Sequence, residues 1–115
     1  MKIIVDLDGT LFLHTDYSKY LMKKSQELYE LSLFKMDLNK ELVKKLKGKE
    51  VFILTGRNEK YFNDATKEQL RDSGIKYKSI IICPKDRLVM NWKKEIVNHL
   101  KNKFKNVEWF DDEAR

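Results

Sequence analysis

The chain has 115 residues, with 24 Lys and Arg against 18 Asp and Glu, a formal net charge of +6 and 42% hydrophobic residues. A domain typically needs roughly 100 to 150 residues, so the length excludes two separate cores and predicts one domain. The single cysteine, Cys83, excludes an intramolecular disulfide and a multi-cysteine zinc site, and no apolar stretch approaches the roughly 18 to 20 residues of a membrane span. We therefore expect a cytoplasmic protein with no membrane partner, whose positive charge is compatible with an anionic partner.

Short apolar runs alternate along the chain with longer stretches of helical periodicity. A strand is predicted at residues 2–5, followed by helices over about 18–33 and 39–47. A second strand at 51–54, a helix over 59–73 and a third strand at 79–83 come next, and then a helix over 88–104 and a strand at 107–110. Asn39 is placed to cap the start of the helix over 39–47. Gly48 and Gly74 are placed to end the helices over 39–47 and 59–73. This alternation predicts an α/β fold, a doubly wound parallel sheet with helices on both faces.

Three of the predicted strands end in residues that suit phosphate and metal chemistry. The residues at these ends are Asp6, Asp8, Thr55, Gly56, Arg57, Asp111 and Asp112. Functional sites of doubly wound sheets gather at the carboxyl ends of the strands, so these side chains are expected at one place. Carboxylates from two strands form an oxygen-ligand site suited to Mg²⁺, and the hydroxyl, the glycine amide and the cations suit a phosphate.

Four motifs resemble those of the haloacid dehalogenase-like (HAD) phosphohydrolase superfamily: VDLDGTL (5–11), ILTGR (53–57), a lysine in NWKKEI (91–96) and WFDDE (109–113). The resemblance covers nearly the whole chain and implies an enzyme that cleaves phosphate monoesters with Mg²⁺. It implies that Asp6 is the nucleophile that accepts the phosphoryl group, and that Asp8 is the general acid and then the general base. It further implies that Thr55 and the Gly56 amide bind phosphate, and that Asp6, the backbone carbonyl of Asp8 and Asp111 hold the metal.

The motif lysine has two candidates, and two further residues have open roles. Because a helix advances about 100° per residue, Lys93 shares the apolar face of its helix while Lys94 turns toward solvent, which favours Lys93 as the phosphate-site lysine. Arg57 has two possible roles, a contact with phosphate or a surface ion pair. Asp112 also has two possible roles, a carboxylate of the metal site or a solvated acidic residue at the start of a helix.

Other readings of the sequence compete with the phosphohydrolase. Receiver domains of signalling proteins share the length and the acidic site but place their phosphoacceptor Asp after the third strand, where this chain reads IIICPK. A nucleotide-binding loop of the GxxxxGK or GxGxxG type is missing from the sequence. Three alternatives remain. Asp6 and Asp8 can be ordinary polar residues of the turn that follows a strand, and the lysines can lie on solvated helix faces. The chain can also be a non-catalytic basic module that binds nucleic acid.

The sequence departs from the family at two places. Neither gap between motifs accommodates a cap domain, so we expect a protein without one. Family members usually continue past the fourth motif with a further helix and strand, so residues 1–115 are expected to be a truncated domain or a minimal one whose last strand forms a sheet edge. A weaker resemblance, to the phosphatase domain of bacteriophage polynucleotide kinase-phosphatases, together with the basic charge, predicts a 3′-phosphate at a nucleic-acid end as substrate, with a nucleotide or sugar phosphate as the alternative.

Overall fold

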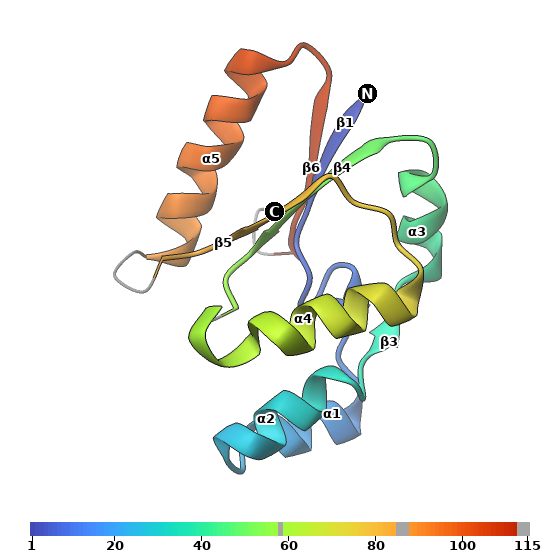
Figure 1. Cartoon of the computed structure of the whole chain (residues 1–115), viewed down its shortest axis with the longest axis vertical. Coiled ribbons are helices and arrows are strands. Elements are labelled where there is room, and N and C mark those ends of the chain that lie inside the picture. The colour runs from blue at the N-terminus through green and yellow to red at the C-terminus, as the bar shows by residue number, and fades with distance from the viewer. Residues whose placement is uncertain (58, 85–87, 113–115) are drawn as a thin grey trace.

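The computed structural model of the chain describes residues 1–57, 59–84 and 88–112 (Figure 1). It shows a mixed α/β fold. The elements are, in order, β1 (Lys2–Val5), β2 (Phe12–Leu13), α1 (Asp16–Met22), α2 (Gln26–Leu33), β3 (Asp37–Leu38), α3 (Lys40–Leu46), β4 (Glu50–Thr55), α4 (Glu59–Ser73), β5 (Ser79–Ile82), α5 (Val89–Lys103) and β6 (Val107–Phe110). Each strand predicted from an apolar run is present, within one residue at each end.

The main sheet has four parallel strands in the order β5-β4-β1-β6. Val5 at the end of β1 is in register with Ile53 of β4 on one side and with Phe110 of β6 on the other. The chain adds β4 and β5 on one side of β1 and then returns to place β6 on the other side, so the strand order reverses beside β1. In parallel sheets, ligand sites lie outside the carboxyl ends of the strands at such a reversal.

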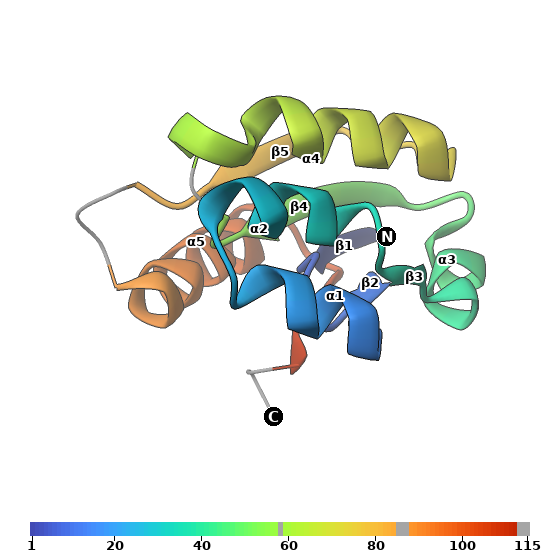
Figure 2. The same ribbon diagram turned by 90° about the horizontal axis from the view of Figure 1, so that it is seen from below.

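Both faces of this sheet are covered by helices, as continuous apolar strands predict. Side chains of successive strand residues point to opposite faces, and Figure 2 shows α4 and α5 on opposite sides of the sheet. One face forms a buried cluster with α3 and α4, and the other with α5. The first cluster includes Ile3, Val5, Val51, Ile53, Leu42, Leu46 and Leu70, and the second includes Ile4, Phe52, Leu54, Trp92 and Val97. The fold is therefore compatible with a Rossmann-like doubly wound sheet.

The helix predicted over residues 18–33 is wrong, because the structure has two helices there. Ser25 interrupts the segment: its side chain accepts a hydrogen bond from the Leu28 N–H at 3.2 Å and caps α2. Thr15 caps α1 in the same way, accepting from the Ser18 N–H at 3.0 Å. Serine and threonine hydroxyls satisfy the free N–H groups of a helix start, so the chain turns at residues 23–25 and forms a helical hairpin, α1–α2.

The helical hairpin is inserted into a small antiparallel sheet that the sequence did not predict. In this sheet β2 pairs with β3, with Phe12 opposite Leu38 and Leu13 opposite Asp37. α2 packs against α4, where the Gln69 side chain donates a hydrogen bond to the Leu33 carbonyl at 2.6 Å. Figures 1 and 2 place the hairpin at the edge of the main sheet where β1 ends. In the described part of the chain, no helix is long and apolar enough to cross a membrane.

Candidate active site

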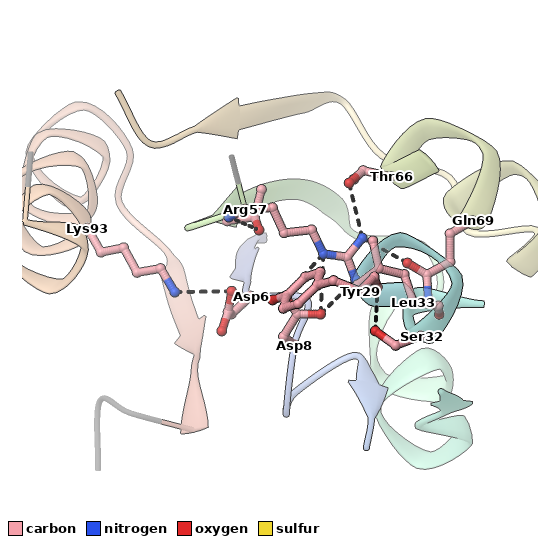
Figure 3. Close-up of polar contacts among 10 residues, drawn as sticks. Asp6, Asp8, Tyr29, Ser32, Leu33, Arg57, Thr66, Gln69 and Lys93 are labelled. Carbon is pink, nitrogen blue, oxygen red and sulfur yellow. Dashed lines mark hydrogen bonds and ion pairs between the residues drawn. The ribbon is translucent and has the colours of Figure 1, made fainter. Parts of the chain in front are cut away.

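Asp6, Asp111 and Lys93 meet at the carboxyl edge between β1 and β6. The Lys93 Nζ lies 3.0 Å from Oδ1 of Asp6 (Figure 3). It also lies 2.7 Å from Oδ2 of Asp111. Only 6% of Asp6, 6% of Asp111 and 3% of Lys93 is exposed, whereas Lys94 is exposed. The prediction that Lys93, and not Lys94, faces the site is therefore confirmed, while its role on phosphate stays a prediction.

Burial and charge set the ionisation of this group. Burial raises the pKa of Asp6 to about 6, opposed by the charge of Lys93 and reinforced by the charge of Asp111. Burial alone would lower the pKa of Lys93, but its hydrogen bond to Asp111 and the charge of Asp6 outweigh burial and raise it. Two carboxylates thus share one ammonium group, which leaves an excess of negative charge that favours a further cation.

The carboxylates here fit a hard metal ion. Asp6, Asp111 and Asp112 each offer an oxygen, and these oxygens lie within 4.8 Å of one another. The exposed Asp112 is positioned by Thr10, whose hydroxyl accepts from the Asp112 N–H at 3.1 Å and donates to its Oδ1 at 3.5 Å. An all-oxygen set drawn from two strands is what Mg²⁺ prefers. The Asp8 carbonyl, the further ligand that the family resemblance implies, stays a prediction.

Gly9 is required in the first motif for two reasons. Its φ angle is +80°, in the region that side chains of L-amino acids rarely adopt. A Cβ at this position would also lie 2.4 Å from Oδ2 of Asp112, so this carboxylate would have to move. Glycine therefore lets the turn after β1 adopt its backbone conformation with the Asp112 carboxylate where it is, which gives a physical reason for the glycine of the DLDGT motif.

Asp8 is held by Arg57. The Arg57 Nε donates to both carboxylate oxygens of Asp8, at 3.2 and 3.1 Å, and its Nη2 donates to Oδ1 at 2.7 Å. The arginine side chain is only 2% exposed, while that of Asp8 is 28% exposed. This two-oxygen contact fixes the orientation of the Asp8 carboxylate, as a bidentate pair does.

A polar network continues from Arg57 into α4 and the helical hairpin. The Arg57 Nη1 donates to Oγ1 of Thr66 at 3.1 Å and to Oε1 of Gln69 at 2.8 Å, and Gln69 in turn reaches the Leu33 carbonyl (Figure 3). Arg57 therefore forms an ion pair, with Asp8, but is itself buried, so the surface placement considered for this pair is wrong. The contact of Arg57 with phosphate stays a prediction. To make this contact, the arginine would have to reach past Asp8.

Thr55 and Gly56 lie between this network and the start of α5. Thr55 is 1% exposed, and its hydroxyl accepts from the Arg57 N–H at 3.1 Å. A Cβ on Gly56 would lie 2.7 Å from Cγ1 of Val89, so glycine lets the end of β4 approach the helix that carries Lys93. The structure thus places both residues at the predicted edge, and their contacts with phosphate stay predictions.

Four residues of this region were not singled out from the sequence: Thr10, Tyr29, Thr66 and Gln69. Thr10 stands in the DLDGT motif, which is the one place where the sequence could have suggested a role. Tyr29 of α2 is half-buried; burial raises its pKa, the charge of Asp8 raises it further, and that of Arg57 lowers it. The polar environment of Asp8 therefore includes residues from the helical hairpin and from α4, which sequence spacing does not connect.

Asp111 and Asp112 are expected to differ as metal ligands. Asp111→Ala should raise the Mg²⁺ concentration needed for half-saturation at least roughly tenfold more than Asp112→Ala, because the Asp111 side chain is fully buried beside Asp6 and Asp112 is exposed. Isothermal titration calorimetry of Mg²⁺ into each variant measures this. The opposite ranking would make Asp112 the main ligand.

Arg57→Ala is expected to lower the free energy of unfolding by about 2 to 4 kcal/mol, because it removes the partner of Asp8 and leaves the polar groups of Thr66 and Gln69 without a donor. Urea denaturation followed by circular dichroism measures the loss. Arg71→Ala is the matched control: its side chain is 74% exposed in ion pairs of α4, and it should cost less than about 0.5 kcal/mol. Equal losses for the two variants would show that the buried network contributes nothing specific.

Comparison with protein-family models and with curated protein sequences finds no match for this chain. Two chains of solved structures are similar. One, described as "Structure of Pnkp1/Rnl/Hen1 complex", shares 26% identity with a TM-score of 0.62 over 93% of this chain and 36% of its own length. The other, "Structure of the Pnkp1/Rnl/Hen1 RNA repair complex", shares 25% identity with a TM-score of 0.57 over 85% of this chain and 31% of its own length. This chain therefore spans about a third of the length of these neighbours, and its fold is similar to that of one part of each.

Proposed function

We propose that the protein is a Mg²⁺-dependent phosphohydrolase that removes a phosphate monoester, a 3′-phosphate, from a nucleic-acid end through a phosphorylated Asp6. The observation that carries the proposal is the buried arrangement of Asp6, Lys93 and Asp111 at the strand-order reversal, with Asp112 beside it. An Asp nucleophile, a fixed cation and a set of metal-ligand oxygens at one point are the groups that transfer of a phosphoryl group requires.

In the first step, an oxygen of Asp6 attacks the phosphorus, the bond from phosphorus to the leaving oxygen breaks, and Asp8 gives its proton to that oxygen. The attack brings an anion to a phosphate, which costs on the order of 4 kcal/mol per charge pair at 4 Å and an effective dielectric of 20. Lys93, 3.0 Å from Asp6, offsets this repulsion. A metal held by Asp6, Asp111 and Asp112 would neutralise further negative charge.

In the second step, Asp8 takes a proton from water as the water oxygen attacks the phosphorus. The bond from phosphorus to Asp6 breaks, inorganic phosphate leaves, and Asp8 has recovered the proton that it gave up. Arg57 keeps the Asp8 carboxylate in one place through both steps by its contact with both oxygens. Arg57 acts here as a positioning residue.

The substrate class is supported by charge and by the comparisons. The chain carries a net charge of +6, which favours a polyanion. One of the two similar solved chains comes from a complex described as an RNA repair complex, which supports a nucleic-acid substrate for this chain. These neighbours are also consistent with the resemblance to polynucleotide kinase-phosphatases. A nucleic-acid end is therefore favoured over a sugar phosphate or free nucleotide.

The test is a comparison of kcat/KM with Mg²⁺ on a 3′-phosphorylated oligonucleotide, on mononucleotides and on sugar phosphates. The oligonucleotide should be preferred at least roughly tenfold, about 1.4 kcal/mol, and the preference should shrink as salt rises. Equal or better hydrolysis of a sugar phosphate at every salt concentration would make the protein a small-molecule phosphatase. Salt-sensitive binding of the oligonucleotide without turnover of any substrate would make it a non-catalytic binding module.

A further inference from the structure

Asp112, which offers an oxygen within 4.8 Å of one oxygen each of Asp6 and Asp111, borders a hollow of about 410 Å³. Asp111 and Asp112 form part of its wall, and apolar side chains from three elements, Leu13, Leu42 and Phe110, form another part. This volume is within the range of sites for small organic molecules, roughly 300 to 1,000 Å³. Two other hollows among the described residues, one of about 530 Å³ beside Gly48 and Gly74 and one of about 300 Å³ beside Phe12 and Gln69, are lined by none of these three carboxylates.

Lys45 is the basic residue in the wall of this hollow, within the described part of the chain. It is exposed in the last turn of α3, and its Nζ lies 5.9 Å from the centroid of the Phe110 ring, so the side chain reaches from α3 toward β6. Glu41, one turn earlier on the same helix, also lines the hollow. The hollow is therefore not a basic patch: besides the acidic residues Glu41, Asp111 and Asp112 it has one cation among the described residues, at one point, which offers a counter-ion to one phosphate group.

We propose that this hollow binds the nucleotide that carries the scissile 3′-phosphate, with its sugar and base against the apolar wall and its 5′-phosphate on Lys45. The inference rests on the proposed function, because a terminal phosphate at Asp6 leaves the remainder of its nucleotide in the adjoining space. A nucleotide has an apolar base face and a second phosphate a sugar away from the first. The hollow offers an apolar wall and one cation beside the Asp112 carboxylate.

The experiment compares nucleoside 3′-monophosphate with nucleoside 3′,5′-bisphosphate, which differ only in the group that Lys45 is proposed to bind. Loss of the 3′-phosphate is followed by chromatography with Mg²⁺ at fixed salt. The wild-type protein should show at least fivefold higher kcat/KM on the bisphosphate. Lys45→Ala should bring the ratio of the two substrates close to one. Lys44→Ala, the adjacent exposed lysine of α3 outside the hollow, should leave the ratio as in the wild type.

The inference is overturned if the wild type does not prefer the bisphosphate, or if Lys45→Ala keeps that preference. It is also overturned if Lys44→Ala and Lys45→Ala reduce the preference equally, because this would indicate only the general positive electrostatic field of the protein. Absence of hydrolysis of both compounds, and of the 3′-phosphorylated oligonucleotide, by the wild type would instead overturn the proposed function. In that case equilibrium binding of the same two compounds to the same three proteins decides the inference, with the same ratios expected and the same outcomes against it.

Discussion

Asp6→Asn is expected to lower kcat for hydrolysis of a 3′-phosphorylated oligonucleotide by more than about a thousandfold, because the amide cannot act as the nucleophile that forms the phosphorylated enzyme. The fold should survive, since asparagine has nearly the same shape and its carbonyl oxygen can still accept from Lys93. Release of inorganic phosphate measures the rate, and circular dichroism with thermal unfolding measures the fold.

Asp72→Asn is the matched control for this change. Asp72 is an exposed residue of α4, outside the carboxylate cluster, so the same loss of one negative charge should leave the rate within about twofold of the wild type. If Asp6→Asn keeps wild-type turnover, Asp6 is not the nucleophile and the mechanism given above is wrong.

Lys93→Ala is expected to lower kcat/KM by about a hundredfold to a thousandfold, roughly 3 to 4 kcal/mol, because it removes the fixed cation beside the nucleophile. Lys94→Ala, one position along the same helix but exposed, should remain within about twofold of the wild type. Reversed sensitivities would contradict the assignment of the site to the face of α5 that carries Lys93.

A second readout separates the chemical role of Lys93 from a structural one. Its removal leaves two buried carboxylates, Asp6 and Asp111, without their shared counter-ion, so the melting temperature should fall. Added Mg²⁺ should restore much of the melting temperature, because a cation can occupy the same charged space. The rate should stay low at saturating Mg²⁺. Full recovery of the rate with the metal would show that Lys93 serves only to neutralise the charge of the two carboxylates.

The sheet and most helices could be predicted because their determinants are local. Buried parallel strands need continuous apolar runs, and the four runs are found as β1, β4, β5 and β6. Asn39 caps α3 by accepting from the Leu42 N–H at 3.3 Å, and Gly48 and Gly74 adopt positive φ angles of 73° and 74° after α3 and α4. These are preferences of single residues, which a sequence displays directly.

The helical hairpin could not be predicted as confidently, because two patterns competed within it. Apolar residues on both sides of Ser25 recur at helical spacing, which favoured one continuous helix, whereas a serine hydroxyl at a free helix start favours a break. The break is observed. The strands β2 and β3 have only two residues each, too few for any alternation of polar and apolar residues to be visible.

The carboxylates and Lys93 could be predicted because strand ends and helix faces fix where they lie. The partners of Arg57 could not, because Thr66 and Gln69 reach it across the packing of α4, and the packing depends on the whole fold. Lys45 was not singled out from the sequence, which suggested only solvated faces for the lysines of the helices. Its place in the wall of the hollow follows from how α3 lies against β6, which no local pattern encodes.

The central claim, transfer of the phosphoryl group to Asp6, is tested most directly by trapping that group on the protein. An oligonucleotide with a radiolabelled 3′-phosphate is mixed with excess protein and Mg²⁺, the reaction is stopped with acid after a fraction of one turnover, and protein-bound label is counted and located by peptide mass spectrometry. The account predicts label on the peptide that contains Asp6, and none with Asp6→Asn. Release of phosphate without any protein-bound label, or label on a different residue, would contradict it.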